Sequence, residues 1–175
     1  RYIHRKGATP AHDGDKVVIP MNMGDGVVIG MLLSDGTIDI ERSKALVEAA
    51  GTMEVTFHRA FDRCKDPFIA LEEIIATGCK RILTSGQVPS APDALDLLQT
   101  LVEEAGGQII IMPGSGVRGN NIATIKTVTN AKEFHSSARK VVPTNMQFVK
   151  ESMQENLQNM LVDTKDIQTM LAAIA

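Results

Sequence analysis

The chain has 175 residues, 43% of them hydrophobic and 22% charged, so it can fold around its own core and is too apolar to be intrinsically disordered. A formal net charge of -3 at pH 7 gives no electrostatic reason to expect a nucleic acid partner, and no apolar run is long enough to span a membrane. Two cysteines cannot form a disulfide framework, so we expect a reducing, cytoplasmic location.

Residues 1–24 differ in composition from the rest of the chain. They begin with a basic stretch, continue with turn-forming residues, and contain a short strand predicted at residues 17–19. The chain opens on Arg1 and not on methionine, which suggests a processed chain or a fragment. We predict a boundary near Gly24, with residues 25–175 as the main domain.

Short apolar runs alternate with longer amphipathic segments from residue 26 onward. Their spacing leaves room for one strand, one helix and two short loops in each repeat. Uninterrupted apolar runs suit a parallel sheet that is buried on both faces. The pattern predicts an α/β protein with five βα units, whose strands cover residues 27–33, 53–58, 81–84, 108–112 and 133–136.

Capping residues mark the helices between these strands. Asp66 and Pro67 are typical of a helix N-terminus, and Gly78 is typical of the end of that helix. Asp39 begins the preceding helix, and Gly106 follows the stripe of apolar residues that forms the next one. Two further helices are predicted near residues 122–128 and 167–174.

Five βα units match a large part of a TIM-type (β/α) barrel, which takes about 250 residues when complete. The alternative is an open doubly wound sheet, which we disfavour because no G-x-G-x-x-G follows the first strand. We therefore predict a partial TIM-type barrel of about five βα units plus an N-terminal strand. Because an open barrel exposes sheet edges, we expect a homo-oligomer in which a second copy closes the opening.

Polar residues follow the predicted strands, where barrels of this type carry their chemistry. His58, Arg59 and Asp62 come after the second strand and predict a catalytic acid or base beside an anion-binding cation. His135, at the end of the fifth strand, is a second catalytic candidate. The alternatives are a hydrogen-bonded strand-end histidine and a simple ion pair between Arg59 and Asp62.

A glycine turn follows the fourth strand. Gly114, Ser115 and Gly116 offer backbone N–H groups to a phosphate, and Ser137 and Arg139 follow the next strand. Barrels often bind phosphate between the loops of their last two strands. These five residues predict a site for a small anionic ligand, with an ordinary tight turn as the alternative.

Cys64 is the candidate metal ligand of the sequence, because copper(I) prefers thiolate and thioether sulfur. Cys79 lies just before the third strand, so we expect it at the opposite end of the sheet. The alternative for Cys64 is a free loop thiol. We interpret most of the nine methionines as flexible core residues.

Five segments of the chain resemble the CutC family of copper homeostasis proteins. They are DGVVIGMLLSDGTID (25–39), VTFHRAFD (55–62), LTSG (83–86), MPGSG (112–116) and EFHSSAR (133–139). The resemblance runs over residues 25–175. It implies a TIM-type barrel whose fourth to eighth strands lie in this chain, a cytoplasmic location and a link to copper. It also implies that the family's first three βα units, with the early cysteines proposed as copper ligands, have no counterpart here.

The N-terminal segment is similar to part of another family. YIHRKGAT (2–9) and VVIP (17–20) resemble the RtcB family of RNA-splicing ligases, manganese enzymes in which such a histidine is guanylylated. The resemblance implies that His4 is the nucleophile, with Arg5 and Lys6 near phosphates. The metal-binding residues of the ligases have no counterpart here, so we interpret the segment as a strand and loop at the edge of the barrel fragment.

Three functions fit these observations. The first, which we favour, is copper homeostasis, with copper(I) or a small anion as the ligand. The second is an enzyme that acts on a small phosphorylated or carboxylated substrate. The third is a recombined or engineered barrel fragment without a selected activity.

Overall fold

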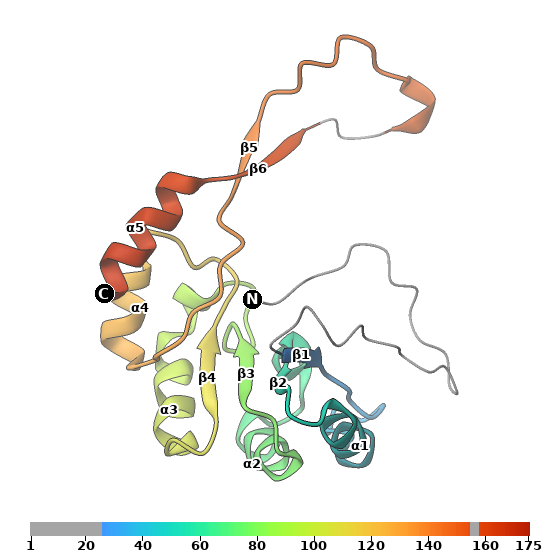
Figure 1. Cartoon of the computed structure of the whole chain (residues 1–175), viewed down its shortest axis with the longest axis vertical. Coiled ribbons are helices and arrows are strands. Elements are labelled where there is room, and N and C mark those ends of the chain that lie inside the picture. Colours follow the sequence, from blue (N-terminus) through green and yellow to red (C-terminus); the bar gives the residue numbers. More distant parts are fainter. Residues whose placement is uncertain (1–25, 155–157) are drawn as a thin grey trace.

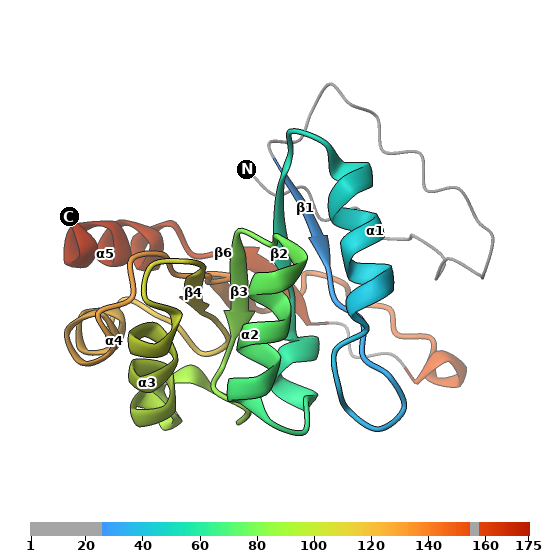
Figure 2. The same cartoon turned by 90° about the horizontal axis from the view of Figure 1, so that it is seen from below.

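The computed structural model describes residues 26–154 and 158–175. A four-stranded parallel sheet, in the order β1-β2-β3-β4, forms its centre, and helices alternate with these strands along the chain. The strands are β1 (Gly26–Ile29), β2 (Glu54–Phe57), β3 (Arg81–Thr84) and β4 (Ile110–Pro113). Helices α1 (Ile40–Ala50), α2 (Pro67–Thr77) and α3 (Leu95–Ala105) lie along one face of the sheet (Figure 2). The predicted α/β class is confirmed.

The helix caps form where the sequence predicts them. The carboxylate of Asp66 accepts hydrogen bonds from the backbone N–H groups of Phe68 and Ile69, and Gly78 ends α2 in the left-handed conformation. The Asp39 carboxylate caps α1 through the N–H of Arg42. Two short 3-10 helices, η1 (Arg59–Arg63) and η2 (Ala91–Asp93), lie in the loops after β2 and β3.

The core lies between the sheet and these helices. Side chains alternate along a strand, so Val55 and Phe57 of β2, Ile82 of β3 and Ile111 of β4 share one face. All four are buried. At the amino ends of the strands, buried Arg81 forms ion pairs with Glu54 and Glu133 at 2.6 and 2.8 Å.

The predicted fifth strand at residues 133–136 is wrong. Only one parallel bridge, between Gly114 and His135, joins this segment to β4. Pro113 has no N–H to donate, and the N–H of Gly114 is already bonded to the carbonyl of Thr84 on β3. The edge of β4 therefore offers few donors to a further strand.

The chain forms an antiparallel hairpin in place of a fifth parallel strand. After α4 (Ile122–Thr129), strands β5 (Arg139–Val142) and β6 (Asn159–Val162) pair with each other and not with the main sheet. The described part of their connection, residues 143–154 with η3 (Glu151–Met153), extends away from the body of the molecule (Figure 1). Helix α5 (Thr164–Ile174) then returns and packs on α4.

The predicted N-terminal strand at residues 17–19 lies outside the described residues. So does His4, and the boundary predicted near Gly24 stays a prediction. Within the described ranges, no helix is long and apolar enough to cross a lipid bilayer.

Candidate functional site

The carboxyl ends of the parallel strands form a continuous polar edge. The loop after β2 reaches the end of β3, because Arg59 bonds to Ser85. The loop after β3 meets the loop after β4, where the Ser115 hydroxyl donates to the carbonyl of Pro89 at 2.8 Å. The N–H of His135 in turn donates to Pro113 at the end of β4. The sequence therefore predicted correctly that these loops are neighbours.

Asp62 is the centre of the hydrogen-bond network at this edge. Its side chain is only 7% exposed, and its two oxygens accept from the Arg59 Nε at 2.6 Å and the Thr84 hydroxyl at 2.5 Å. The backbone N–H groups of Ser85 and Gln87 donate to the same carboxylate at 3.0 and 3.3 Å. One carboxylate thus ties the η1 turn to the end of β3.

These donors determine the charge state of Asp62. Burial would raise its pKa, but the hydrogen bonds from Thr84, Arg59, Ser85 and Gln87 outweigh burial and hold the pKa below its ordinary value of 3.8. The carboxylate is ionised at neutral pH, and its lone pairs are occupied by these donors. Asp62 is therefore suited to positioning Arg59 and unsuited to accepting a proton from a substrate.

Arg59 is the cation of this edge. Its Nε and Nη2 atoms are bonded to Asp62 and to the Ser85 hydroxyl, the latter at 2.6 Å. Within the described part of the chain, its Nη1 atom has no hydrogen-bond partner, and 40% of the side chain is exposed. Two bonds hold the guanidinium in place while one corner of it faces outward, which is a geometry suited to an anion.

His58 caps the η1 turn. Its Nδ1 atom accepts a hydrogen bond from the N–H of Ala60 at 3.0 Å, so the proton of the neutral ring resides on Nε2. Burial lowers the pKa of His58 below its ordinary value of 6.5, and the charge of Arg63 acts in the same direction. His58 is neutral at pH 7 and can donate from Nε2.

Gly30 makes room for this ring. A Cβ atom at Gly30 would lie 2.3 Å from both Nδ1 and Cε1 of His58, which is far inside van der Waals contact. The absence of a side chain at the end of β1 therefore permits the ring to lie against the backbone. The sequence analysis missed Gly30. The signal that could have found it is a glycine at the end of one predicted strand, when the next strand along the chain ends in a histidine.

The glycine turn after β4 is tightly packed. Ser115 and Gly116 both have positive φ angles, 71° and 76°, and a Cβ at Gly116 would lie 2.1 Å from the Ser90 hydroxyl. A Cβ at Gly114 would lie 2.4 Å from a methyl group of Leu83. Packing accounts for both glycines, and their role as a phosphate cradle stays a prediction.

The remaining predicted residues lie farther along this edge. His135 is exposed and packs beside Gly114. Ser137 and Arg139 are exposed, and neither side chain has a hydrogen bond or ion pair to any other residue that the structure describes. Arg139 is the first residue of β5, so it belongs to the root of the hairpin. The structure does not join these residues to Arg59.

Cys64, the predicted copper ligand, is a buried free thiol. Its Sγ atom lies 3.2 Å from the side-chain amide of Gln87 and 3.5 Å from the carbonyl of Asp66. Burial raises the pKa of the Cys64 thiol to about 11, so the thiol is protonated at neutral pH. Cys79 bonds to Thr77 near the amino end of β3. Across residues 26–154 and 158–175, no three His, Cys, Asp or Glu side chains gather around a possible metal position.

A four-stranded parallel sheet whose strands alternate with helices defines a protein of the α/β class. The sequence profile of the CutC family matches residues 12–140, and the chain belongs to this family. The match begins inside the segment that the sequence analysis set apart and ends near the start of β5. The resemblance to the CutC family is thus confirmed.

Individual relatives agree with this assignment. CutC family proteins from Parabacteroides distasonis and Chromobacterium violaceum are 53% and 49% identical to the chain over 116 and 111 residues, or 66% and 63% of its length. These regions are 48% and 45% of the relatives, so the chain spans about half the length of the curated relatives it matches. A solved CutC structure from Streptococcus agalactiae, described as a candidate copper homeostasis protein, is 33% identical with a TM-score of 0.60. It covers 63% of this chain and 55% of its own.

Proposed function

We propose that this chain contributes to copper homeostasis by binding a small phosphorylated or carboxylated molecule at the carboxyl edge of its sheet. The copper link comes from the description of its solved relative. One observation carries the anion site. Arg59 is held in place by Asp62 and Ser85, while its side chain keeps 40% exposure and an Nη1 atom without a partner among the described residues.

Two groups would meet the ligand. A fixed guanidinium presents N–H donors that match the oxygens of a phosphate or carboxylate. The neutral His58 ring, on the same turn, supplies a second donor from Nε2. Because Asp62 offsets the charge of Arg59, we expect a dissociation constant of about 1 mM and not a micromolar one.

The same geometry argues against the two other roles. Asp62 is unsuited to proton transfer, which needs free lone pairs, because its carboxylate already accepts from four residues. Cys64, the predicted copper ligand, is a buried thiol that is protonated at neutral pH. We therefore assign the ligand role to Arg59 and not to a thiolate.

The two free, buried cysteines suit a reducing compartment, and we place the protein in the cytoplasm.

Calorimetric titration with inorganic phosphate tests the proposal. Arg59→Ala is expected to weaken phosphate binding at least tenfold. Arg59→Lys keeps the positive charge but loses the paired N–H donors of the guanidinium, so its affinity should lie between those of the native chain and Arg59→Ala. Arg63→Ala is the matched control, because Arg63 is an exposed cation on the same turn. Thermal unfolding of each variant shows whether it is folded. Equal binding by the native chain and the folded Arg59→Ala variant would disprove the anion site.

A copper(I) competition titration examines the other half of the proposal. The native chain is expected to bind copper(I) no more tightly than an exposed model thiol does. Tighter binding that is lost in a folded Cys64→Ser variant would restore Cys64 as a ligand and contradict the assignment.

A further inference from the structure

The charges of the groups that meet at Arg59 cancel. The Arg59 guanidinium bonds through Nε to the Asp62 carboxylate at 2.6 Å, and this carboxylate is only 7% exposed. His58, on the same turn, is neutral at pH 7 because burial lowers the pKa of its ring below 6.5. Among the residues that the structure describes, Arg59 is the one cation in contact with Asp62. The site therefore offers hydrogen-bond donors to an anion without offering a net positive charge.

Asp62 can neither move away from the site nor lose its charge. Its oxygens also accept from the Thr84 hydroxyl and from the backbone N–H groups of Ser85 and Gln87. These donors fix the carboxylate at the end of β3. They also hold its pKa below 3.8, so it stays ionised at neutral pH. A ligand of Arg59 thus shares the guanidinium with a fixed negative charge.

The open part of the guanidinium is its Nη1 end. Nε and Nη2 are used by Asp62 and Ser85, whereas Nη1 has no partner in the described part of the chain. Because the guanidinium is small and planar, a ligand at Nη1 comes close to the Asp62 carboxylate on the other side. The first negative charge of the ligand lies nearer to the cation than to this carboxylate, so attraction exceeds repulsion. A second negative charge, farther from the cation, gains little attraction and still has to leave water.

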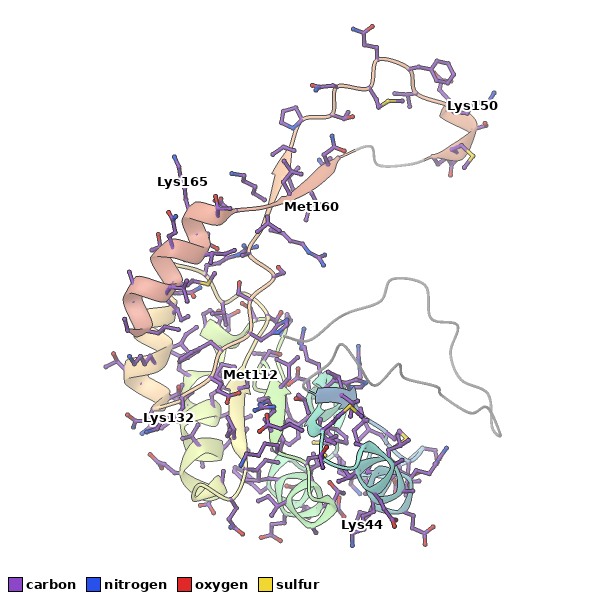
Figure 3. All side chains as sticks on the ribbon, in the orientation of Figure 1. Lys44, Met112, Lys132, Lys150, Met160 and Lys165 are labelled. Atoms are coloured by element: carbon purple, nitrogen blue, oxygen red, sulfur yellow. The ribbon has the colours of Figure 1, made fainter. Side chains whose placement is uncertain are left out.

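Other cations do not compensate for a second charge on the ligand. Arg63 lies on the same turn but is exposed, so water and salt screen its charge. Lys150 in the hairpin connection and Lys165 on α5 stand away from the ends of β2 and β3 (Figure 3). In the described residues, the hydrogen-bond network of Asp62 therefore holds no second cation that could meet a doubly charged ligand.

We propose that the Arg59 site selects a carboxylate, with one negative charge, over a phosphate group with two, and that Asp62 sets this preference. The inference rests on the anion site proposed above and narrows its ligand to the carboxylated class. A carboxylate carries a single charge at neutral pH, whereas a phosphate monoester carries about −1.5 to −2. The two oxygens of a carboxylate also match the paired N–H donors of a guanidinium. Asp62 determines specificity through Arg59 and does not itself touch the ligand.

Titration of the full chain with acetate and with methyl phosphate tests the preference. At pH 8 acetate has one negative charge and methyl phosphate has two, because the second pKa of a phosphate monoester is about 6. Nuclear magnetic resonance titrations at constant ionic strength are expected to show acetate binding at least threefold more tightly. Equal or tighter binding of methyl phosphate would overturn the inference and leave the anion site itself intact. Failure of both anions to bind would overturn the anion site as well.

Asp62→Asn tests the role assigned to Asp62. The variant removes the negative charge and keeps the shape, so the affinity for methyl phosphate relative to acetate is expected to rise at least threefold. A purely structural role would weaken the binding of both anions alike and leave this ratio unchanged. Asp93→Asn is the matched control, because it removes the same charge from an exposed position on η2 and should leave the ratio at its native value. Circular dichroism shows that each variant keeps its helices, and a native ratio in folded Asp62→Asn would overturn the assignment.

Discussion

Replacement of Asp62 tests how far one carboxylate organises the carboxyl edge of the sheet. Asp62→Ala removes the acceptor of Arg59, Thr84, Ser85 and Gln87 at once and leaves buried donors without partners. Loss of a buried charged acceptor is expected to lower the free energy of unfolding by about 3 kcal/mol at pH 7. Asp62→Asn keeps the shape and one carbonyl acceptor, so a loss of about 1–2 kcal/mol is expected.

Urea unfolding followed by circular dichroism measures these differences, with Asp93→Ala as the control. Asp93 is exposed on η2, and its replacement should change stability by less than about 0.5 kcal/mol. The pH dependence adds a second test. The folded-state pKa of Asp62 is lowered, so its stabilisation is complete above the ordinary value of 3.8 and is lost as the pH falls through the folded-state pKa. The difference between the native chain and Asp62→Asn should therefore shrink on acidification. The reasoning would be refuted if the native chain and Asp62→Asn had the same free energy of unfolding at pH 7, or if the difference between them stayed constant as the pH fell below 3.8.

Three further predictions concern single side chains. Gly30→Ala should lower the free energy of unfolding by about 1–3 kcal/mol, because its methyl group would collide with the His58 ring. Urea unfolding should show a much smaller cost of the same substitution in a His58→Ala background. Additive effects of the two substitutions would contradict the contact. Ser43→Ala should raise the midpoint of thermal unfolding, since the fully buried Ser43 hydroxyl has no partner among the described residues and its removal is worth about 1 kcal/mol; a lower midpoint would mean that the hydroxyl has one. Cys64 should react slowly with iodoacetamide at pH 7 in the folded chain and rapidly in urea, because burial raises the pKa of its thiol to about 11; fast reaction in the folded state would show a thiolate.

The local signals of the sequence were sufficient for the βα core. Helix α2 begins after Asp66 and ends at Gly78 because each residue satisfies backbone groups that have no partner within the helix. This effect is local and does not depend on the surrounding fold. The apolar runs of β2 to β4 likewise need only burial on both faces. The predicted first strand was too long, since β1 ends at Ile29.

The rest depends on contacts between distant residues. The sequence around residues 133–136 does not show why a fifth strand fails to form. The reason lies at the end of β4, where Pro113 has no N–H and the N–H of Gly114 is already bonded to the carbonyl of Thr84. Asp62 was predicted as a catalytic residue, and the hydrogen-bond network around it depends on donors about 22 to 25 residues away in the chain. The sequence placed His58, Arg59 and Asp62 together and could not distinguish a proton-transfer group from a positioning group.

The central claim is that the edge formed by Arg59, His58 and the end of β3 binds a small anion. Titration of the isotope-labelled chain with inorganic phosphate, followed by nuclear magnetic resonance of its backbone amides, tests this most directly. The largest shifts are expected at the amides of residues 58–62 and 84–87, with loss of these shifts in Arg59→Ala and their retention in Arg63→Ala. Shifts confined to other parts of the chain, or none at millimolar phosphate, would contradict the claim.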